Sequence, residues 1–430
     1  MQTMSRYEKY KPSGIDWIGE VPLDWEIKKL KHILLGVNSG DGISKNDMEE
    51  DGEFEIYGGN GVMGYTNKYN SEGEVIVIGR VGAKCGVTYL LDKNLWISDN
   101  ALQTRTYQNY KYLFYLLVAV DFNQYANQNA QPLITGTIVK NFPIPFVINK
   151  DEQLAIANYL DDQTQKIDRL ITNKKAQAEK LKELRQIEIN NAVTKGLNPN
   201  VEMKDSGIEW LGKIPKHWEV KKIKQLLKPE KNAIKTGPFG SDLKFEDLIE
   251  EGIKVYNQRS VLDNDWKSGE GYISAEKYES LKTCTIFPND IVITTRGTIG
   301  KVSIFPSDAE LGILHPCLMR IQMNSQRILN DYLKIIINDS SFFFEALKLA
   351  SNATTIDVIY SDSLKEVKIP VPPTNDQIEI TTYLQKRISA IEQLIKNIDA
   401  QIEKLQELRK IKIYEAVTGK IKVNGYEKRN

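Results

Sequence analysis

The sequence predicts an α+β protein in which two tandem mixed α/β domains are each followed by one long helix. Three observations support this. The stretch SGIDWIGEVPLDWEIKKLK, which begins at Ser13, returns as SGIEWLGKIPKHWEVKKIK at Ser206. A second repeat pairs residues 153–194 with 377–418. In both copies of this second repeat apolar residues recur at heptad spacing, which is typical of long helices.

The first repeat is rich in tryptophan, and we call its copies, residues 10–34 and 203–227, the tryptophan segments. They align without a gap and share identical anchor residues, namely the pairs Trp17/Trp210, Gly19/Gly212, Pro22/Pro215 and Trp25/Trp218. A repeat this long indicates duplication of a whole domain rather than a solenoid. We expect Trp17 and Trp25 to be buried anchors that tie each domain to the base of a long helix.

The two repeats divide the chain into five parts. These are a first domain at 1–148, a first long helix at 149–196, a second domain at 197–372, a second long helix at 373–420 and a tail at 421–430. The interval between the two repeats is 31 residues longer in the second copy. The two domains therefore differ in length and in sequence, while the segments around them are alike.

Each long helix has start and stop signals. Asn149 with Glu152, and Thr374 with Gln377, fit the capping-box pattern at a helix start. Gly196 and Gly419 are expected stops. Some 42 residues at about 1.5 Å each give helices of roughly 60 Å.

The apolar stripe of each helix is too thin for a helix that stands alone in water, so we expect the two helices to pack against each other. The predicted seam consists of Ile167, Leu170, Gln177, Leu181, Leu184, Ile391, Leu394, Ile398, Gln401, Leu405 and Leu408. Gln177 and Gln401 are equivalent in the repeat. We predict that they form a buried amide pair at the centre of the seam, where such a pair would fix register.

The domains between the repeats read as mixed α and β. Residues 74–91 and 290–305 each read as a strand, a glycine turn and a strand. An amphipathic helix is predicted after each, near 112–125 and near 332–349.

Motifs for catalysis are weak. Residues 59–64 fit GxGxxG, but another strand rather than a helix follows, so we interpret them as a tight turn. Residues 297–301 resemble a phosphate loop but lack its first glycine and final hydroxyl. The three histidines are scattered and predict neither a triad nor a metal site.

Polar, glycine-rich and basic loops remain in both domains. Their Asn, Gln and Arg side chains can read base edges, and their Lys and Ser side chains can hold phosphates. The candidate DNA-binding residues are Asn60, Tyr65, Asn67, Lys68, Arg80, Lys84, Lys235, Thr236, Ser241, Lys244, Asn257, Gln258, Arg259 and Arg296. The alternative for each is a structural turn with a solvated charge.

Composition narrows the setting. Lys and Arg balance Asp and Glu at 57 each, so nucleic-acid binding must come from local patches. The three cysteines are far apart, which indicates a reducing compartment. The first residues carry no apolar signal, and the longest apolar run, from Tyr112, is nine residues. We expect a cytoplasmic protein with no membrane partner.

The ordered, doubled set of motifs resembles the specificity (S) subunit of type I restriction–modification systems over nearly the whole chain. The resemblance rests on SGIDWIGEVPLDW and its copy, on YGGNGVMGYTN and KTGPFGSDLK, on PVPPTNDQ, and on EKLKELR and EKLQELR within the long helices. One departure is that residues 149–152 interrupt the first proline lead, where the second has Pro372 and Pro373.

The resemblance implies two target recognition domains, each reading one half of a split site in double-stranded DNA, and long helices that form an antiparallel coiled coil between them. It also implies two methyltransferase subunits, which use S-adenosylmethionine to methylate adenine at N6, and restriction subunits, which use ATP and Mg²⁺. The S subunit is then not a catalyst and binds none of these cofactors.

Tandem copies joined by antiparallel helices have a pseudo-two-fold axis, and a two-fold binder reads half-sites whose spacing follows the distance between its domains. Two alternatives stay open. One is a coiled-coil adaptor whose domains bind proteins rather than DNA. The other is an enzyme that forms the recognition part of a fused restriction–methylation polypeptide.

Overall fold

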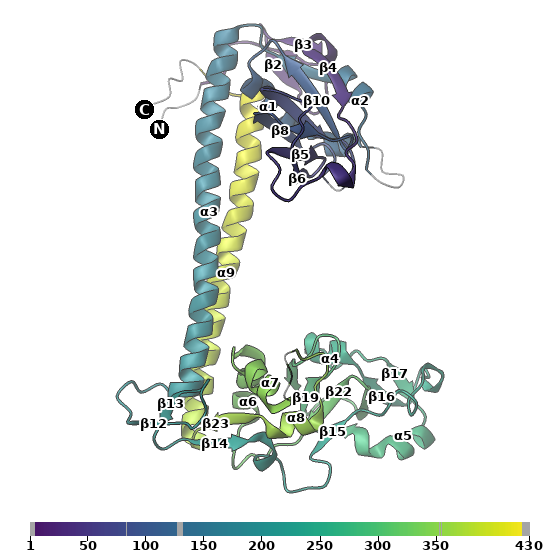
Figure 1. Ribbon diagram of the computed structural model, residues 1–430, viewed down its shortest axis with the longest axis vertical. Coiled ribbons are helices and arrows are strands. Elements are labelled where there is room, and N and C mark those ends of the chain that lie inside the picture. The colour runs from purple at the N-terminus through teal and green to yellow at the C-terminus, as the bar shows by residue number, and fades with distance from the viewer. Residues whose placement is uncertain (1–4, 83, 127–131, 352, 354, 424–430) are drawn as a thin grey trace. The chain divides into compact units, whose positions relative to one another are not determined.

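The computed structural model describes residues 5–82, 84–126, 132–351, 353 and 355–423. The chain divides into two compact units, and Figure 1 labels the elements of both. Unit 1 consists of residues 1–176 and 398–430, and unit 2 consists of residues 177–397. Each unit holds one mixed α/β domain and about half of each long helix. Most of the predicted tail, from 424 onward, lies outside the described residues.

Unit 1 is built from a four-stranded antiparallel sheet, a three-stranded sheet and two short strand pairs. Its strands are β1 (Tyr10–Pro12), β2 (Glu20–Pro22), β3 (Glu26–Lys29), β4 (Leu34–Ser39), β5 (Phe54–Gly58), β6 (Gly61–Thr66), β7 (Glu74–Gly79), β8 (Thr88–Asp92), β9 (Trp96–Ile97), β10 (Ala101–Thr106) and β11 (Pro143–Phe146). Its own helices are α1 (Tyr110–Val120) and α2 (Gly136–Asn141), with 3₁₀ turns at Leu30–His32, Lys45–Asp47 and Phe122–Tyr125.

Unit 2 repeats this plan with insertions. Its strands are β12 (Met203–Asp205), β13 (Lys213–Pro215), β14 (Glu219–Lys222), β15 (Ile234–Thr236), β16 (Ile253–Tyr256), β17 (Gly271–Ile273), β18 (Thr285–Ile286), β19 (Ile291–Thr294), β20 (Val302–Ile304), β21 (Gly312–Leu314), β22 (Leu318–Ile321) and β23 (Lys368–Val371). Its own helices are α4 (Gln258–Leu262), α5 (Ala275–Leu281), α6 (Asn330–Asp339), α7 (Phe343–Ser351) and α8 (Ser361–Glu366), with 3₁₀ turns at Ile223–Gln225, Phe245–Asp247 and Lys282–Cys284.

The duplication seen in the sequence is therefore a duplication of structure. The four-stranded sheet β15-β22-β19-β20 has the strand order of β4-β10-β7-β8, and the pair β14-β23 corresponds to β3-β11. The parallel pair β16-β21 corresponds to β5-β9. The predicted hairpins are β7-β8 and β19-β20. The predicted helix at 332–349 is instead two helices, because α6 ends at Asp339 and the next residue, Ser340, is extended; its N–H bonds to the carbonyl of Ile335.

In the two equivalent four-stranded sheets, the inner strands β7 and β19 contribute side chains to clusters on both faces. In β7, Ile76 and Ile78 belong to the cluster that also contains α1, whereas Val75 and Val77 pack with β9. In β19, Ile291 and Ile293 face the cluster of α6, and the residue between them faces another. Since successive side chains of a strand point to opposite faces, one strand joins two layers of each domain.

The two long helices are α3 (Lys150–Lys195) and α9 (Thr374–Val417). Asn149 caps α3, because its Oδ1 accepts from the N–H of Asp151 at 2.8 Å and from that of Glu152 at 3.3 Å. Gly196 follows α3 with φ +75° and Gly419 follows α9 with φ +73°, the left-handed geometry that favours glycine at a helix end.

A tryptophan fastens the start of each long helix. The indole N–H of Trp25 donates to Glu152 at 3.2 Å, and that of Trp218 donates to Asp376 at 2.9 Å. Both indoles are buried. The carboxylate of Glu152 also accepts from Tyr7, so it serves this anchor rather than the predicted capping box.

The same tryptophans contact the ends of the long helices. A Cβ placed on Gly196 would lie 3.2 Å from the ring of Trp218, and one placed on Gly419 would lie 3.4 Å from the ring of Trp25. Each tryptophan therefore contacts the end of one long helix and the start of the other. The prediction that Trp25 anchors the base of a long helix is confirmed.

A fully buried glutamine completes each fastening. The amide of Gln153 donates to the carbonyl of Val147 at 2.7 Å, and that of Gln377 donates to the carbonyl of Pro372 at 2.8 Å. Their Oε1 atoms accept from the backbone N–H of the N-cap residues of α1 and α6. The prediction that Gln377 forms a capping box is wrong, because its side chain points into the domain and bonds to two segments there, at Arg327–Leu329 and at Pro372.

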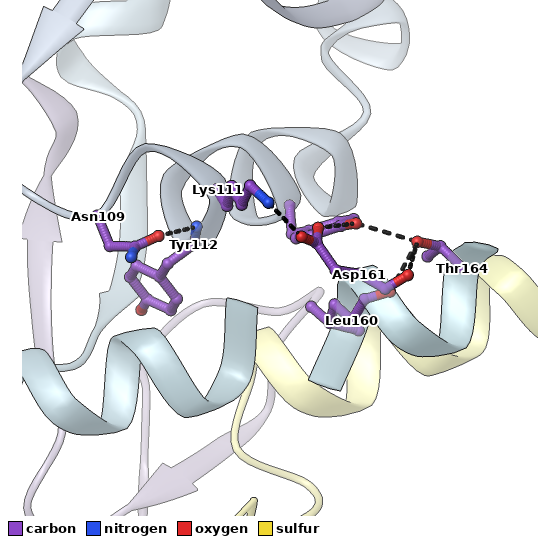
Figure 2. Close-up of polar contacts among 7 residues, drawn as sticks. Asn109, Lys111, Tyr112, Leu160, Asp161 and Thr164 are labelled. Atoms are coloured by element: carbon purple, nitrogen blue, oxygen red, sulfur yellow. Dashed lines mark hydrogen bonds and ion pairs between the residues drawn. The ribbon is translucent and has the colours of Figure 1, made fainter. Parts of the chain in front are cut away.

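A polar network ties α1 to α3 in unit 1 (Figure 2). Asp161 pairs with Lys111 and accepts from the hydroxyl of Tyr115 at 2.8 Å. Thr164 lies 3.0 Å from the same hydroxyl and donates to the carbonyl of Leu160. Burial is the largest cause of the raised pKa of Tyr115, so its hydroxyl keeps its proton and acts as a donor. The network fixes the angle at which α3 leaves the domain.

Within each unit, α3 and α9 run antiparallel. In unit 2, Arg185 lies 3.6 Å from Glu392, and Glu188 pairs with Arg387 at 3.2 Å. The residue numbers therefore increase along α3 in the direction in which they decrease along α9. In unit 1, the Asp168 carboxylate accepts from Arg409 at 3.0 Å. Partly exposed ion pairs of this kind contribute little stability, so the apolar seam must hold the helices together.

The observed seam differs by one residue from the predicted one at every second position. The buried and half-buried positions alternate three and four residues apart: Leu160, Thr164, Ile167, Ile171, Lys174, Ala178, Leu181 and Arg185 in α3, and Leu384, Ile388, Ile391, Ile395, Ile398, Ile402, Leu405 and Arg409 in α9. The exposed positions, where the prediction is wrong, are Leu170, Gln177, Leu184, Leu394, Gln401 and Leu408. The true seam is hard to recognise in the sequence because it includes Lys and Arg residues, whose aliphatic stems cover part of it.

Gln177 and Gln401 therefore do not form a buried amide pair. Both side chains are exposed, and the residues that follow them, Ala178 and Ile402, are buried at 5% and 8% exposure. The buried stripe of each helix is therefore small or apolar at this point and carries no amide that could fix register.

We predict that replacing Gln377 by Met lowers the free energy of unfolding by about 1–3 kcal/mol, because the backbone groups of Arg327, Leu329 and Pro372 lose their partner. Denaturant unfolding of the full chain, followed by tryptophan fluorescence, measures the change. Gln406→Met is the matched control, since Gln406 is exposed on the same helix. The control should stay within about 0.5 kcal/mol of the wild type. Equal stability of both variants would contradict the fastening role.

Candidate nucleic-acid interface

In unit 2, three loops converge on the turn His315–Cys317, which joins β21 to β22. The carbonyl of the first residue of the turn would lie 2.1 Å from a Cβ on Gly237, so only glycine fits there. The N–H of the same turn residue donates to Tyr256 at 2.9 Å. The carbonyl of the last turn residue accepts from the N–H and the hydroxyl of Thr295, at 2.8 and 2.9 Å.

These contacts gather most of the unit 2 candidates at one edge of the domain. In the sequence, each candidate lies within three positions of Gly237, Tyr256 or Thr295, the residues that contact the turn. The candidates brought together are Lys235, Thr236, Asn257, Gln258, Arg259 and Arg296. Ser241 and Lys244 lie further along the first of the three loops, where both are exposed on either side of the buried Leu243.

Two of the gathered amides have structural roles. The Oδ1 of Asn257 caps α4 by accepting from the N–H of Arg259 at 3.0 Å, and its amide donates to Glu270 at 2.8 Å. The amide of Gln258 donates to the carbonyl of Arg296 at 3.0 Å. These side chains hold the loops in place, so only part of their hydrogen-bonding capacity is left for a ligand.

The gathered cations are available to a ligand. Within the described parts of the chain, the side chains of Lys235, Arg259 and Arg296 have no hydrogen-bond or ion-pair partner. Elsewhere in the unit, by contrast, Lys222 and Lys224 both bond to Glu366, and these bonds lower the pKa of that carboxyl to about 2. Unpaired cations at one edge suit phosphate contacts.

The turn itself adds no charge to this edge. Burial lowers the pKa of His315 and raises the pKa of the Cys317 thiol, so both are uncharged at neutral pH. Their Nδ1 and Sγ atoms lie 3.0 Å apart. The charge of the edge therefore comes from the surrounding cations and from Glu270, which accepts a hydrogen bond from Asn257.

Unit 1 repeats the arrangement around the turn Ser98–Asn100, between β9 and β10. The N–H of Arg80 donates to the last residue of that turn at 3.0 Å, and its guanidinium donates to the carbonyl of Asp99 at 3.0 Å. A Cβ on Gly40 would lie 2.1 Å from the carbonyl of Ile97, just as Gly237 approaches its turn. Asn60 follows Gly59, which also packs on the turn, and Lys84 is exposed in the loop after β7.

Three unit 1 candidates are not brought to this edge. Tyr65, Asn67 and Lys68 lie at the far end of β6 from Asn60. Asn67 donates to Glu49 at 2.6 Å, and Lys68 pairs with Asp47 at 2.6 Å. The hydrogen bond from Lys68 is the largest cause of the lowered pKa of Asp47. These polar groups join the end of β6 to the segment at residues 47–49.

The residues that organise the two edges, His315–Cys317 and Ser98–Asn100, were missed by the sequence analysis. Neither turn carries a recognisable motif. The glycines that touch them, Gly40 and Gly237, are the available signal, because each follows the first strand of its four-stranded sheet in both copies.

The described residues contain no group of three or more His, Cys, Asp or Glu side chains arranged to hold a metal ion. Residues 59–64 form the turn and second strand of the hairpin β5-β6, as predicted, and no helix follows them. Among the described residues, no helix is both long and apolar enough to cross a membrane.

Comparisons with known proteins agree with this architecture. The family described as type I restriction modification DNA specificity domain matches residues 22–180 and 215–404. The type I restriction enzyme MjaVIII specificity subunit of Methanocaldococcus jannaschii is 25% identical, over 94% of each chain.

Two solved structures share the fold. One, from work on complex assembly and conformational transition of the type I R-M system, has a TM-score of 0.68 at 13% identity and covers 93% of this chain and 99% of its own. The HsdS subunit from Thermoanaerobacter tengcongensis has a TM-score of 0.50 at 15% identity and covers 93% of this chain and 98% of its own. The repeated domains, the repeated long helices and the family match over most of the length lead to one conclusion: the chain belongs to the family of type I restriction–modification specificity subunits.

Proposed function

We propose that this chain is the non-catalytic subunit that reads a bipartite DNA site, with each unit reading one half. The observation that carries the proposal is the repeated edge, at which three loops converge on a turn in both units. The frame of the two edges is alike, but the turn is Ser98–Asn100 in one and His315–Cys317 in the other. Different side chains on the same frame should read different half-sites.

The long helices offer a matching place for partner subunits. In unit 1, Leu170, Leu408 and Ile411 are 49%, 40% and 42% exposed, and we call them patch 1. Patch 2, in unit 2, consists of the equivalent residues Leu394, Leu184 and Ile187, which are 51%, 38% and 56% exposed. Each patch takes residues from both helices.

The members of each patch lie on one side of the helix pair. Leu170 and Leu408 each stand directly before a seam residue, Ile171 and Arg409. Equivalent positions of two antiparallel helices flank their seam on the same side, and Ile411 extends the patch by one i, i+3 step. Exposed apolar groups in this arrangement fit the apolar face of a partner helix.

We assign each patch to one methyltransferase subunit, which gives two per chain. Those subunits use S-adenosylmethionine to methylate adenine at N6 in each half-site. Restriction subunits that use ATP and Mg²⁺ join the complex to cut unmodified DNA. Support for this assignment comes from the family and from the presence of one equivalent patch in each unit.

We expect the pair of substitutions Leu170→Glu and Leu408→Glu to remove one methyltransferase subunit from the complex, because charges replace the apolar contact. The corresponding pair at Leu394 and Leu184 should remove the other, and all four together should remove both. The mass of the purified complex measures the number bound. Leu35→Glu is the control, since Leu35 is 52% exposed on β4 and outside both patches. Retention of both subunits by the fourfold variant would refute the assignment.

DNA recognition should be modular. Exchange of residues 26–148 for the matching part of another specificity subunit should change one half of the methylated sequence and leave the other unchanged. Sequencing of methylated adenines in cells that carry the hybrid provides the readout. If both halves changed, or if neither did in an active hybrid, the assignment of one half-site to each unit would be wrong. A chain that assembles with its partners but retains no specific DNA would favour the adaptor alternative.

A further inference from the structure

The side chain of Phe239, in unit 2, is exposed to solvent on an ordered turn. It lies in the loop after β15 and is 79% exposed. The loop closes on its backbone, because the carbonyl of Phe239 accepts from the N–H of Asp242 at 2.8 Å and from that of Leu243 at 3.3 Å. Leu243 is buried and anchors the closed turn in the core. The ring therefore projects from a fixed turn rather than from a loose strand.

The other side of this loop is fixed to the candidate interface. Pro238 is buried, and Gly237 packs against the first residue of the turn His315–Cys317. The N–H of Gly237 also donates to the carbonyl of Leu318 at 2.8 Å. Phe239 is thus two residues from Gly237, which packs on the turn where the loops carrying the unpaired cations of unit 2 converge.

The ring of Phe239 contributes little to the stability of the fold. Full burial of a phenylalanine side chain is worth about 1.5–3 kcal/mol, and Phe239 realises only a small part of that. A single exposed apolar residue is ordinary at a protein surface. Here, however, a rigid turn presents the ring beside an edge assigned to DNA, so the apolar surface is available to the ligand of that edge.

The charges around the ring favour a contact with bases over a contact with phosphates. Asp242 stands in the same turn and is exposed, so this turn is a poor ligand for phosphate. Lys235, Arg259 and Arg296, on neighbouring segments, can hold the backbone on either side. A neutral ring presented near such cations suits an apolar side chain that enters a groove and wedges between base steps.

The corresponding position of unit 1 carries no ring. Gly40 approaches its turn as Gly237 does, so the position that corresponds to Phe239 is Gly42. Any contact made by the ring should therefore affect only one half-site.

We propose that the ring of Phe239 contacts base faces in the half-site read by unit 2 and partly unstacks one base step there. This inference rests on the proposed function, because it requires that unit 2 bind duplex DNA.

The test uses the complex of the full chain with its methyltransferase subunits and a duplex that carries the methylated sequence of the wild type. Phe239→Ala should weaken binding about tenfold or more, in line with the loss of a base–aromatic contact. It should leave the slope of log affinity against log salt unchanged, whereas Arg296→Gln should lower that slope by about one. The fluorescence of 2-aminopurine placed in the unit 2 half-site should rise with the wild type and much less with the alanine variant.

Tyr107→Ala is the matched control, because Tyr107 has the same exposed fraction, 79%, but lies beyond the end of β10 that is distant from the turn Ser98–Asn100. It should bind as the wild type does. The proposal is overturned if Phe239→Ala binds within twofold of the wild type with the same 2-aminopurine signal, or if the substitution releases a methyltransferase subunit. If the wild-type complex itself shows no sequence-dependent binding, the proposed function fails instead.

Discussion

The hydrogen bonds at the first turn of each long helix are the constraint on which the rest of the structure depends. Trp25 with Glu152, and Trp218 with Asp376, join a tryptophan segment to a helix start. One residue later, a fully buried glutamine joins the same turn to the segment after the preceding strand and to the N-cap of α1 or α6. Because buried polar groups are costly to leave unpaired, these contacts allow each long helix to leave its domain in only one direction.

The fastened ends explain why the seam between the long helices needs to contribute little to their register. The seam contains Lys174, Arg185 and Arg409 beside its apolar members, and the ion pairs that cross it are partly exposed. Such a seam has little power to fix register by itself. The fastened ends supply that register, and the outer apolar positions of both helices are exposed.

Much of the fold could be predicted from the sequence because both sequence repeats occur in two copies. The repeats located both long helices, and glycine turns located the hairpins β7-β8 and β19-β20. The seam could not be placed, because Leu170, Leu184, Leu394 and Leu408 make a more regular apolar column than the true seam does. Those leucines belong to the exposed patches. In the proposed assembly, their hydrophobicity serves contact with a methyltransferase subunit rather than with the other long helix.

The candidate interface was predicted only in part. Arg80 and Arg296 stood out because they follow apolar strands and precede glycine turns. Asn67 and Lys68 were grouped with them because polar residues in a loop look alike in sequence, whether they close a turn or face a ligand. The turns that organise both edges carry no motif, since their role is to offer backbone groups, and every residue type has those.

The central claim is that two unlike recognition edges on one repeated frame read two unlike half-sites. Sequencing of methylated adenines in cells with and without this gene tests that claim most directly. The account predicts one interrupted motif, with two different halves separated by a fixed number of unread base pairs, that is methylated in both halves only when the gene is present. An uninterrupted motif, or a methylome that does not change with the gene, would contradict it.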